Sequence, residues 1–432
     1  MPFPWLRTTG KTPAFRLKYK PAGKTLVVSF VLLLFIVCSS MISTAPDANM
    51  RRADKAYAKA DFAEAAVWYQ KVLDKDPDNT QALYKLGISY LEMCEPRKAR
   101  LCLDKVNKLD PRFGQKVIVN LAEALHQNYE FEEAKKYYQQ EIYGTGRADW
   151  NYVEVIRKRI DECNAGMELL AQSSVAQVVN MGAVVNSAKV EFAPVLGLND
   201  SLLVFSAHDA PEGPEEIRFS HKKDGQWQNA KEYIPASNAK TGHSIVTISP
   251  DGKLLYTYSP ADGLRSYDQS KGKWVNPKPM PIPLNRLANE TSVHISADGQ
   301  FAFFASDRPG GFGGLDLYVS QRFPDGTWSA AINLGADVNT PYDEDSPFVD
   351  FDTKTLFFSS RGHNTMGGFD IFRSELRDGK WQKAQNLGYP INSPHDDMYF
   401  TLNRKRTTAY FSSDRPGGMG ALDLYQILFS EQ

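Results

Sequence analysis

The chain has 432 residues, with 50 Lys and Arg against 51 Asp and Glu, so its formal net charge is −1. This balance excludes the strong positive field by which basic proteins attract nucleic acid, and the length leaves room for two or three domains. Hydrophobic residues at 42% and aromatic residues at 12% are typical of folded domains and exclude a largely disordered chain.

Residues 1–45 have the pattern of an export signal. Six basic residues between Arg7 and Lys24 precede the apolar run at 26–37, and small residues follow it. The uncharged span 26–45 is also long enough to cross a bilayer as an uncleaved anchor. Cys38 resembles the acylated cysteine of bacterial lipoproteins, although Val37 is bulky where such signals carry Gly, Ala or Ser. We expect the remainder in the periplasm, attached to the outer membrane by lipid or to the inner membrane by the uncleaved segment.

Residues 50–172 predict a helical domain, because Gly and Pro are sparse and apolar residues recur at helical spacing. Pro77 and Pro111 lie 34 residues apart, the period of tetratricopeptide repeats. One unit resembles that family at Leu83, Leu86, Gly87, Tyr90, Ala99, Leu103, Val106 and Pro111. A looser unit follows, and 150–172 predicts a closing helix. We expect this array to bind a partner protein; the alternatives are a spacer or packing on the next domain.

The cysteines indicate neither a metal site nor a dithiol motif. None of the four has C-x-x-C spacing. Cys94 falls at an inter-helix turn and Cys102 in the following helix, where we expect inert thiols. The disulfide state of these two residues and of Cys163 stays open.

Residues 173–432 predict strands and turns that repeat about every fifty residues. Turns of the form [DK]-G-x-W end at four tryptophans 47, 54 and 53 residues apart: Trp227, Trp274, Trp328 and Trp381. Eleven residues later comes an asparagine: Asn238, Asn285, Asn339 or Asn392. Four antiparallel strands per repeat form a β-propeller blade.

The chain ends soon after the third strand of the last repeat, so one outer strand is missing. Residues 175–191 predict that strand, because Asn186 follows Val175 by eleven residues and precedes Glu191 by five, as in the other repeats. The fold prediction is therefore an α+β multidomain chain: an α-solenoid, then a five-bladed propeller closed by its N-terminal outer strand. Closure removes sheet edges that would otherwise aggregate.

A glycine-rich corner is repeated between the second and third strands of the blades. It reads SDRPGGFGGLDLYVS at 306–320, SDRPGGMGALDLYQI at 413–427 and, more weakly, SSRGHNTMGGFDIFRS at 359–374. We expect Asp316, Asp370 and Asp423 to accept backbone N–H bonds within the corner, with Glu216 as a weaker copy. The corner arginines predict structural ion pairs or, alternatively, rim contacts: Arg308, Arg361 and Arg415.

One polar position recurs where each innermost strand begins: Glu191, His243, Glu290, Glu344 and Asp397. Equivalent positions should converge on one channel mouth, where carboxylates repel unless a cation or a donor neutralises them. The ring is thus a candidate site for Ca²⁺ or a basic segment. Because it repeats in register with the asparagines, we favour a structural role.

No catalytic motif is present, since the sequence lacks H-E-x-x-H, G-x-S-x-G and a phosphate-binding loop. We therefore expect a protein that is not an enzyme and that needs no cofactor or metal.

The repeated S-D-R-P-G-G-x-G-x-x-D-L-Y pattern resembles the PD40, or WD40-like, repeats of the TolB propeller and of many Bacteroidota envelope proteins. The order of export signal, tetratricopeptide repeats and propeller is similar to the PorE family of periplasmic subunits in type IX secretion and gliding, but without that family's C-terminal OmpA-like domain. The resemblance implies a non-catalytic scaffold that binds envelope proteins in an outer-membrane assembly and no nucleic acid. The alternative is a propeller that binds a glycan, a peptide or a metal.

Overall fold

The computed structural model describes residues 47–144, 150–172, 174–197, 200–209, 215–233, 244–249, 252–259, 263–270, 273–280 and 290–429. The predicted leader, with Cys38, and the ring member His243 lie outside these residues. Within the described part of the chain, no helix combines the length and apolar character that crossing a membrane requires.

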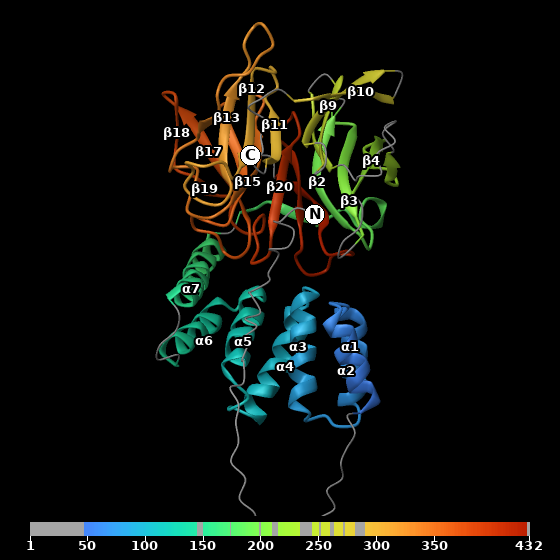
Figure 1. Ribbon diagram of the computed structural model, residues 1–432, viewed down its shortest axis with the longest axis vertical. Coiled ribbons are helices and arrows are strands. Elements are labelled where there is room, and N and C mark those ends of the chain that lie inside the picture. The colour runs from blue at the N-terminus through green and yellow to red at the C-terminus, as the bar shows by residue number, and fades with distance from the viewer. Residues whose placement is uncertain are drawn as a thin grey trace, which may run out of the picture.

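Seven helices form the N-terminal array, as the sequence predicted (Figure 1). They are α1 (Ala48–Ala58), α2 (Phe62–Leu73), α3 (Thr80–Glu92), α4 (Pro96–Leu109), α5 (Gln115–Gln127), α6 (Phe131–Gly144) and α7 (Trp150–Ala171). Local chemistry sets their starts. The side chain of Asn79 caps α3 by accepting from the Ala82 N–H at 3.0 Å. Pro96 is the first residue of α4, where it has no backbone N–H that would need a hydrogen-bond partner.

Two features make the helices pack as hairpins. The turns within the three hairpins each hold one residue in the left-handed region: Ala60, Cys94 and Tyr129, with φ of 60°, 53° and 64°. Between α3 and α4, a Cβ on Gly87 would come within 2.8 Å of the Leu103 side chain. Only glycine therefore permits this approach, which explains the residue in the repeat pattern.

The strands form five antiparallel sheets around a common centre. Blade 1 contains β2 (Val190–Gly197), β3 (Leu202–His208), β4 (Glu216–Lys223), β5 (Gln226–Trp227) and β6 (Lys231–Tyr233). Blade 2 contains β7 (Ser244–Ile248), β8 (Leu254–Ser259), β9 (Gly263–Ser270) and β10 (Lys273–Pro279). Blade 3 contains β11 (Glu290–Ile295), β12 (Phe301–Ser306), β13 (Asp316–Gln321) and β14 (Ile332–Asn333).

Blade 4 contains β15 (Glu344–Val349), β16 (Thr355–Ser360), β17 (Asp370–Arg377), β18 (Lys380–Trp381) and β19 (Gln385–Asn386). Blade 5 contains β20 (Asp397–Leu402), β21 (Thr408–Ser413), β22 (Asp423–Leu428) and β1 (Gln177–Asn180). The innermost strands contact one another in the closed cycle β2, β7, β11, β15, β20 and back to β2. The count of five blades is thus confirmed.

The N-terminal strand closes the ring, as predicted. β1 pairs antiparallel with β22, and Val178 lies opposite Ile427. The Glu191 N–H donates to the Leu422 carbonyl at 2.8 Å, which ties blade 1 to blade 5 directly. The outer edge of blade 5 is therefore paired within the chain.

The repeated tryptophans fill the junctions between blades. The ring of Trp227 in blade 1 meets that of Tyr410 in blade 5 at 5.9 Å between centroids, edge to face. Trp381 in blade 4 meets Phe303 in blade 3 in the same way at 5.9 Å. Each ring thus packs on the preceding blade, and these contacts help to bury the inter-blade core.

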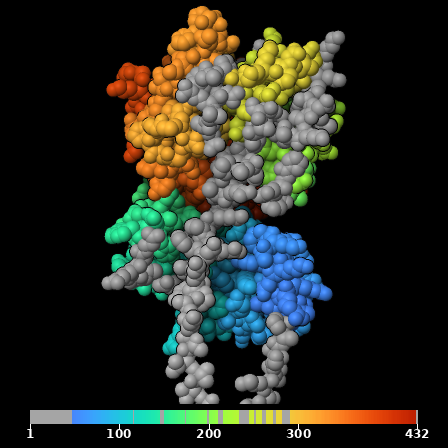
Figure 2. Space-filling model, viewed as in Figure 1, coloured from blue at the N-terminus to red at the C-terminus, as the bar shows by residue number. Residues whose placement is uncertain are grey.

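The helical array packs on the corner-loop side of blades 4 and 5. Figure 2 shows the array directly beneath the propeller. His126 Nε2 lies 2.8 Å from the Met366 carbonyl, and Met366 is buried in the core of the helical array. The rings of Tyr129 and Tyr389 meet edge to face at 5.8 Å. Packing on the next domain, one of the alternatives for the array, is what the structure shows.

Candidate functional site

The corner loops are built on a repeated aspartate. The carboxylate of Asp316 accepts the backbone N–H groups of Phe312 and Gly313 at 2.7 and 3.0 Å. Asp423 accepts those of Met419 and Gly420 at 2.7 and 2.9 Å. In the weaker copy, Asp370 accepts the Met366 N–H at 3.0 Å. These side chains are buried and hold the loop backbone in place.

A pair of asparagines extends this network to the outer strand. Asn333 donates to Asp316 at 2.7 Å, and Asn339 donates to Asn333 at 2.9 Å and to the Leu317 carbonyl at 3.0 Å. Blades 4 and 5 repeat the same bonds with these pairs: Asn386 and Asn392, and Asn180 and Asn186. The asparagine that recurs eleven residues after the tryptophan thus holds the third strand of its blade by hydrogen bonds to the backbone.

Close approach of neighbouring blades explains the third glycine of the corner. A Cβ on Gly313 would lie 2.0 Å from the Tyr342 carbonyl oxygen, and one on Gly367 would lie 2.3 Å from that of Pro394. Gly420 makes the same approach to Lys189, at 1.8 Å. Each partner belongs to the segment that leads into the next blade, so no larger residue fits.

Two of the four described ring carboxylates form buried ion pairs with the corner arginine of their own blade. Arg308 lies 2.8 Å from Glu290 in blade 3, and Arg415 lies 2.6 Å from Asp397 in blade 5. Arg415 also donates to the Ile391 carbonyl at 2.6 Å. In blade 1, Glu191 accepts from Ser187 and lies 3.6 Å from Arg218, which comes from β4.

Blade 4 departs from this pattern, because in its S-S-R corner Ser360, not Ser359, takes the strand-end position of Ser306 and Ser413. Arg361 stands one position earlier and lies 3.2 Å from Asp396 in the segment leading to blade 5. Glu344 instead accepts hydrogen bonds from Thr340 and Ser360, each at 2.6 Å. Burial outweighs these bonds and raises the pKa of Glu344 to about 8.

The ring does not converge on a channel mouth as the sequence analysis expected. The four described carboxylates are buried within their blades, and none of them lines the central cavity. The reason is local, because serine, threonine and arginine side chains beside each strand start bind the carboxylate there. Its donors come from the preceding connector and from the same blade, as at Ser393 and Ser413 for Asp397.

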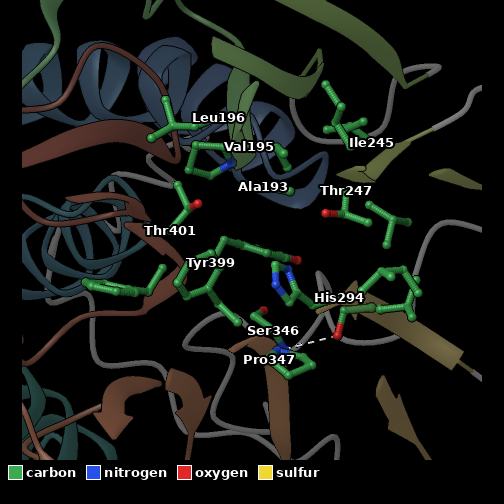
Figure 3. Close-up of a pocket in the computed structure, with 18 of the residues that line it drawn as sticks. Ala193, Val195, Leu196, Ile245, Thr247, His294, Ser346, Pro347, Tyr399 and Thr401 are labelled. Atoms are coloured by element: carbon green, nitrogen blue, oxygen red, sulfur yellow. Dashed lines mark hydrogen bonds between the residues drawn. The ribbon is translucent and has the colours of Figure 1, made fainter. Parts of the chain in front are cut away.

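A central cavity lies further along the innermost strands (Figure 3). It encloses about 110 Å³ and is lined by residues of all five blades. Each lining strand shifts register against its neighbour, as β2 does between Phe192 and Val195 and β20 between Met398 and Thr401. Such bulges bend a strand and redirect its side chains, here toward the cavity.

The cavity is mainly apolar, and polar side chains from several blades also line it, among them Thr247, His294 and Thr401. The rings of His294 and Phe348 are 4.8 Å apart at their centroids. Behind the cavity wall, buried Asp345, which does not itself line the cavity, accepts from Thr291 at 3.0 Å and from the Ser346 N–H at 2.6 Å through the same oxygen. Burial raises the pKa of Asp345 to about 6. This constellation offers polar recognition without a nucleophile–base pair; periodicity missed it, because its members are not repeated.

The corner-loop tips form a second candidate site. Phe312, Met366 and Met419 occupy equivalent positions, because the backbone N–H of each donates to the repeated aspartate. Met366 is fully buried against the helical array, whereas Phe312 and Met419 are 50% and 48% exposed. Aligning the three corner sequences would have shown this shared apolar position.

Fold and sites define a two-module protein, in which a tetratricopeptide-type helical array is joined to a five-bladed β-propeller. The tetratricopeptide repeat family matches residues 56–115. No curated protein matches the chain.

Several solved structures are similar to parts of the chain. One of MamA protein is 27% identical over 28% of this chain, with a TM-score of 0.25, and the match spans 62% of that chain. The Sgt2 TPR domain from Aspergillus fumigatus is 23% identical, over 28% of this chain and 81% of its own, with a TM-score of 0.24. The α-L-arabinofuranosidase PaAbf62A from Podospora anserina is 14% identical, over 59% of this chain and 97% of its own, with a TM-score of 0.41.

Proposed function

We propose that the protein is a non-catalytic scaffold of the cell envelope, which binds protein partners in an outer-membrane assembly of the type IX secretion or gliding kind. Its two modules are of types used for protein interaction. The pattern of residues 1–45 and the PD40-like corners support the envelope location and the relation to the PorE family.

The observation that carries the proposal is the different burial of the three apolar residues at equivalent positions in the corner loops. Met366 shows how this face of the propeller binds a helical surface. Its side chain is buried among the helices, and its own backbone carbonyl lies 2.8 Å from His126 Nε2. Phe312 and Met419 present the same chemistry to solvent on the neighbouring blades. We therefore assign the partner-binding surface to these two exposed residues, on the blades at either side of the contact made by Met366.

The test is purification of the full chain from native envelopes in mild detergent. We expect a stoichiometric membrane complex, which the double substitution Phe312→Ser, Met419→Ser removes without lowering the melting temperature, because both side chains are already half exposed. The matched control is Phe323→Ser, since Phe323 is 47% exposed in the outer turn of blade 3. A complex that survives the double substitution would contradict the assigned surface.

The alternative function is ligand binding in the central cavity, whose lining residues Thr291 and Ser292 are held by the buried carboxylate of Asp345. A protein that leaves the envelope as a free monomer, and whose melting temperature rises with a glycan in the wild type but not in Asp345→Asn, would replace the scaffold proposal with this one.

A further inference from the structure

Three side chains with metal-binding atoms meet where the helical array contacts the propeller. Cys94 comes from the turn between α3 and α4, His395 from the segment leading into β20, and Asp414 from the corner loop after β21. One donor atom from each lies within 4.8 Å of the others. None of these residues takes part in the scaffold contacts proposed above.

The separations fit a small divalent ion. Cys94 Sγ lies 3.8 Å from Asp414 Oδ2, and His395 Nδ1 lies 3.9 Å from Asp414 Oδ1. In a tetrahedral zinc site, bond lengths of about 2.0–2.3 Å put neighbouring donor atoms about 3.3–3.7 Å apart. These two separations are a few tenths of an ångström too long, and the three donor atoms, which lie within 4.8 Å of one another, must move together by up to about 1.5 Å to reach coordination distance.

The imidazole of His395 is buried between the two modules, with 2% of its side chain exposed. Its Nδ1, which lies 3.9 Å from Asp414 Oδ1, is the atom that would bind the ion, since a neutral imidazole nitrogen is a common metal ligand.

The charges around the cluster also favour a cation. Asp396 lies beside Asp414, whose Oδ1 accepts the Asp396 N–H at 2.8 Å. Two arginines lie near the cluster, and each is engaged by a carboxylate outside it: Arg361 by Asp396 and Arg415 by Asp397. A divalent ion would stabilise both the thiolate and the carboxylate.

We propose that Cys94, His395 and Asp414 bind one Zn²⁺ ion that joins the helical array to the propeller. Thiolate, imidazole and carboxylate are the ligand types that zinc takes, and three protein ligands leave the fourth position for water. Binding releases the thiol proton to solvent. The cysteine spacing in the sequence gave no sign of this site, because its ligands are up to 320 residues apart in the chain.

The test uses the full chain in detergent, stripped with a chelator and titrated with Zn²⁺ or Co²⁺. We expect one retained zinc per chain, a rise in melting temperature, and a thiolate-to-cobalt charge-transfer band with Co²⁺. Cys94→Ser should remove the band. It should also weaken zinc binding by more than about 100-fold, because changes to residues that merely support metal ligands already cost about 10–100-fold. His395→Gln should weaken zinc binding in the same way while leaving the fold, checked by circular dichroism, unchanged.

The matched control is Cys102→Ser, which removes a half-buried thiol of α4 outside the cluster. It should bind zinc like the wild type and keep the cobalt band. No retained zinc in the wild type, or equal zinc retention by Cys94→Ser, would overturn the proposal.

Discussion

Arg415→Met is expected to lower the free energy of unfolding by about 3–5 kcal/mol, the cost of leaving one partner of a buried ion pair behind. Asp397 is fully buried, and Arg415 lies 2.6 Å from it. The guanidinium also donates to the carbonyls of Pro390 and Ile391 at 3.0 and 2.6 Å. Methionine fills similar space but satisfies none of these acceptors. Urea denaturation followed by fluorescence measures the loss.

The control for this prediction is Arg377→Met, which breaks the exposed pair with Glu375. Exposed pairs contribute about 0–1 kcal/mol, so little change is expected. Arg415→Lys should fall between the two, because lysine keeps the charge but not the planar fork of donors. Equal losses for Arg415→Met and Arg377→Met would show that the corner arginine does not hold blade 5 together.

Asn186→Ala is expected to cost about 3 kcal/mol, since each buried group that loses its partner costs about 1–3 kcal/mol. Its Oδ1 accepts the Leu424 N–H at 2.9 Å, and its Nδ2 donates to the Leu424 carbonyl at 3.0 Å and to Asn180 at 2.9 Å. The two bonds to Leu424 join residues 238 positions apart. We expect β1 to detach more often, so that limited proteolysis cuts between 174 and 186 sooner.

Asn339→Ala is the matched control, because Asn339 makes the same three bonds inside blade 3, to Leu317 and Asn333. It should lose similar stability without faster cleavage between 174 and 186. Cleavage there at equal rates in the two variants would mean that Asn186 has no special part in closing the ring.

The fold was predictable because each blade repeats the same short sequence motifs. The [DK]-G-x-W turn, the asparagine eleven residues later and the corner aspartate are set by short-range chemistry, so they appear as a period in one sequence. The register of Asn186 even predicted which segment completes blade 5, although its partners lie at the other end of the chain. The shifted arginine of the S-S-R corner was equally visible in the sequence.

Contacts between the two modules were not predictable in this way. Met366 and Phe312 occupy equivalent positions in the sequence, yet one is buried and the other is half exposed. The difference depends on where the helical array docks, which no local pattern encodes. The same holds for Cys94 and His395, which meet only after both modules have folded and packed.

The central claim, that β1 closes the propeller in one register, is tested most directly by cross-strand disulfide formation. Val179 lies opposite Gln426, and directly paired residues in antiparallel strands have Cα atoms about 4.5–5.5 Å apart, within the range of a disulfide. The double substitution Val179→Cys, Gln426→Cys should form a disulfide on mild oxidation, identified by peptide mass mapping. The pair Val179→Cys, Leu428→Cys, two residues out of register, should not. Equal cross-linking of both pairs, or none in the first, would contradict the closed ring.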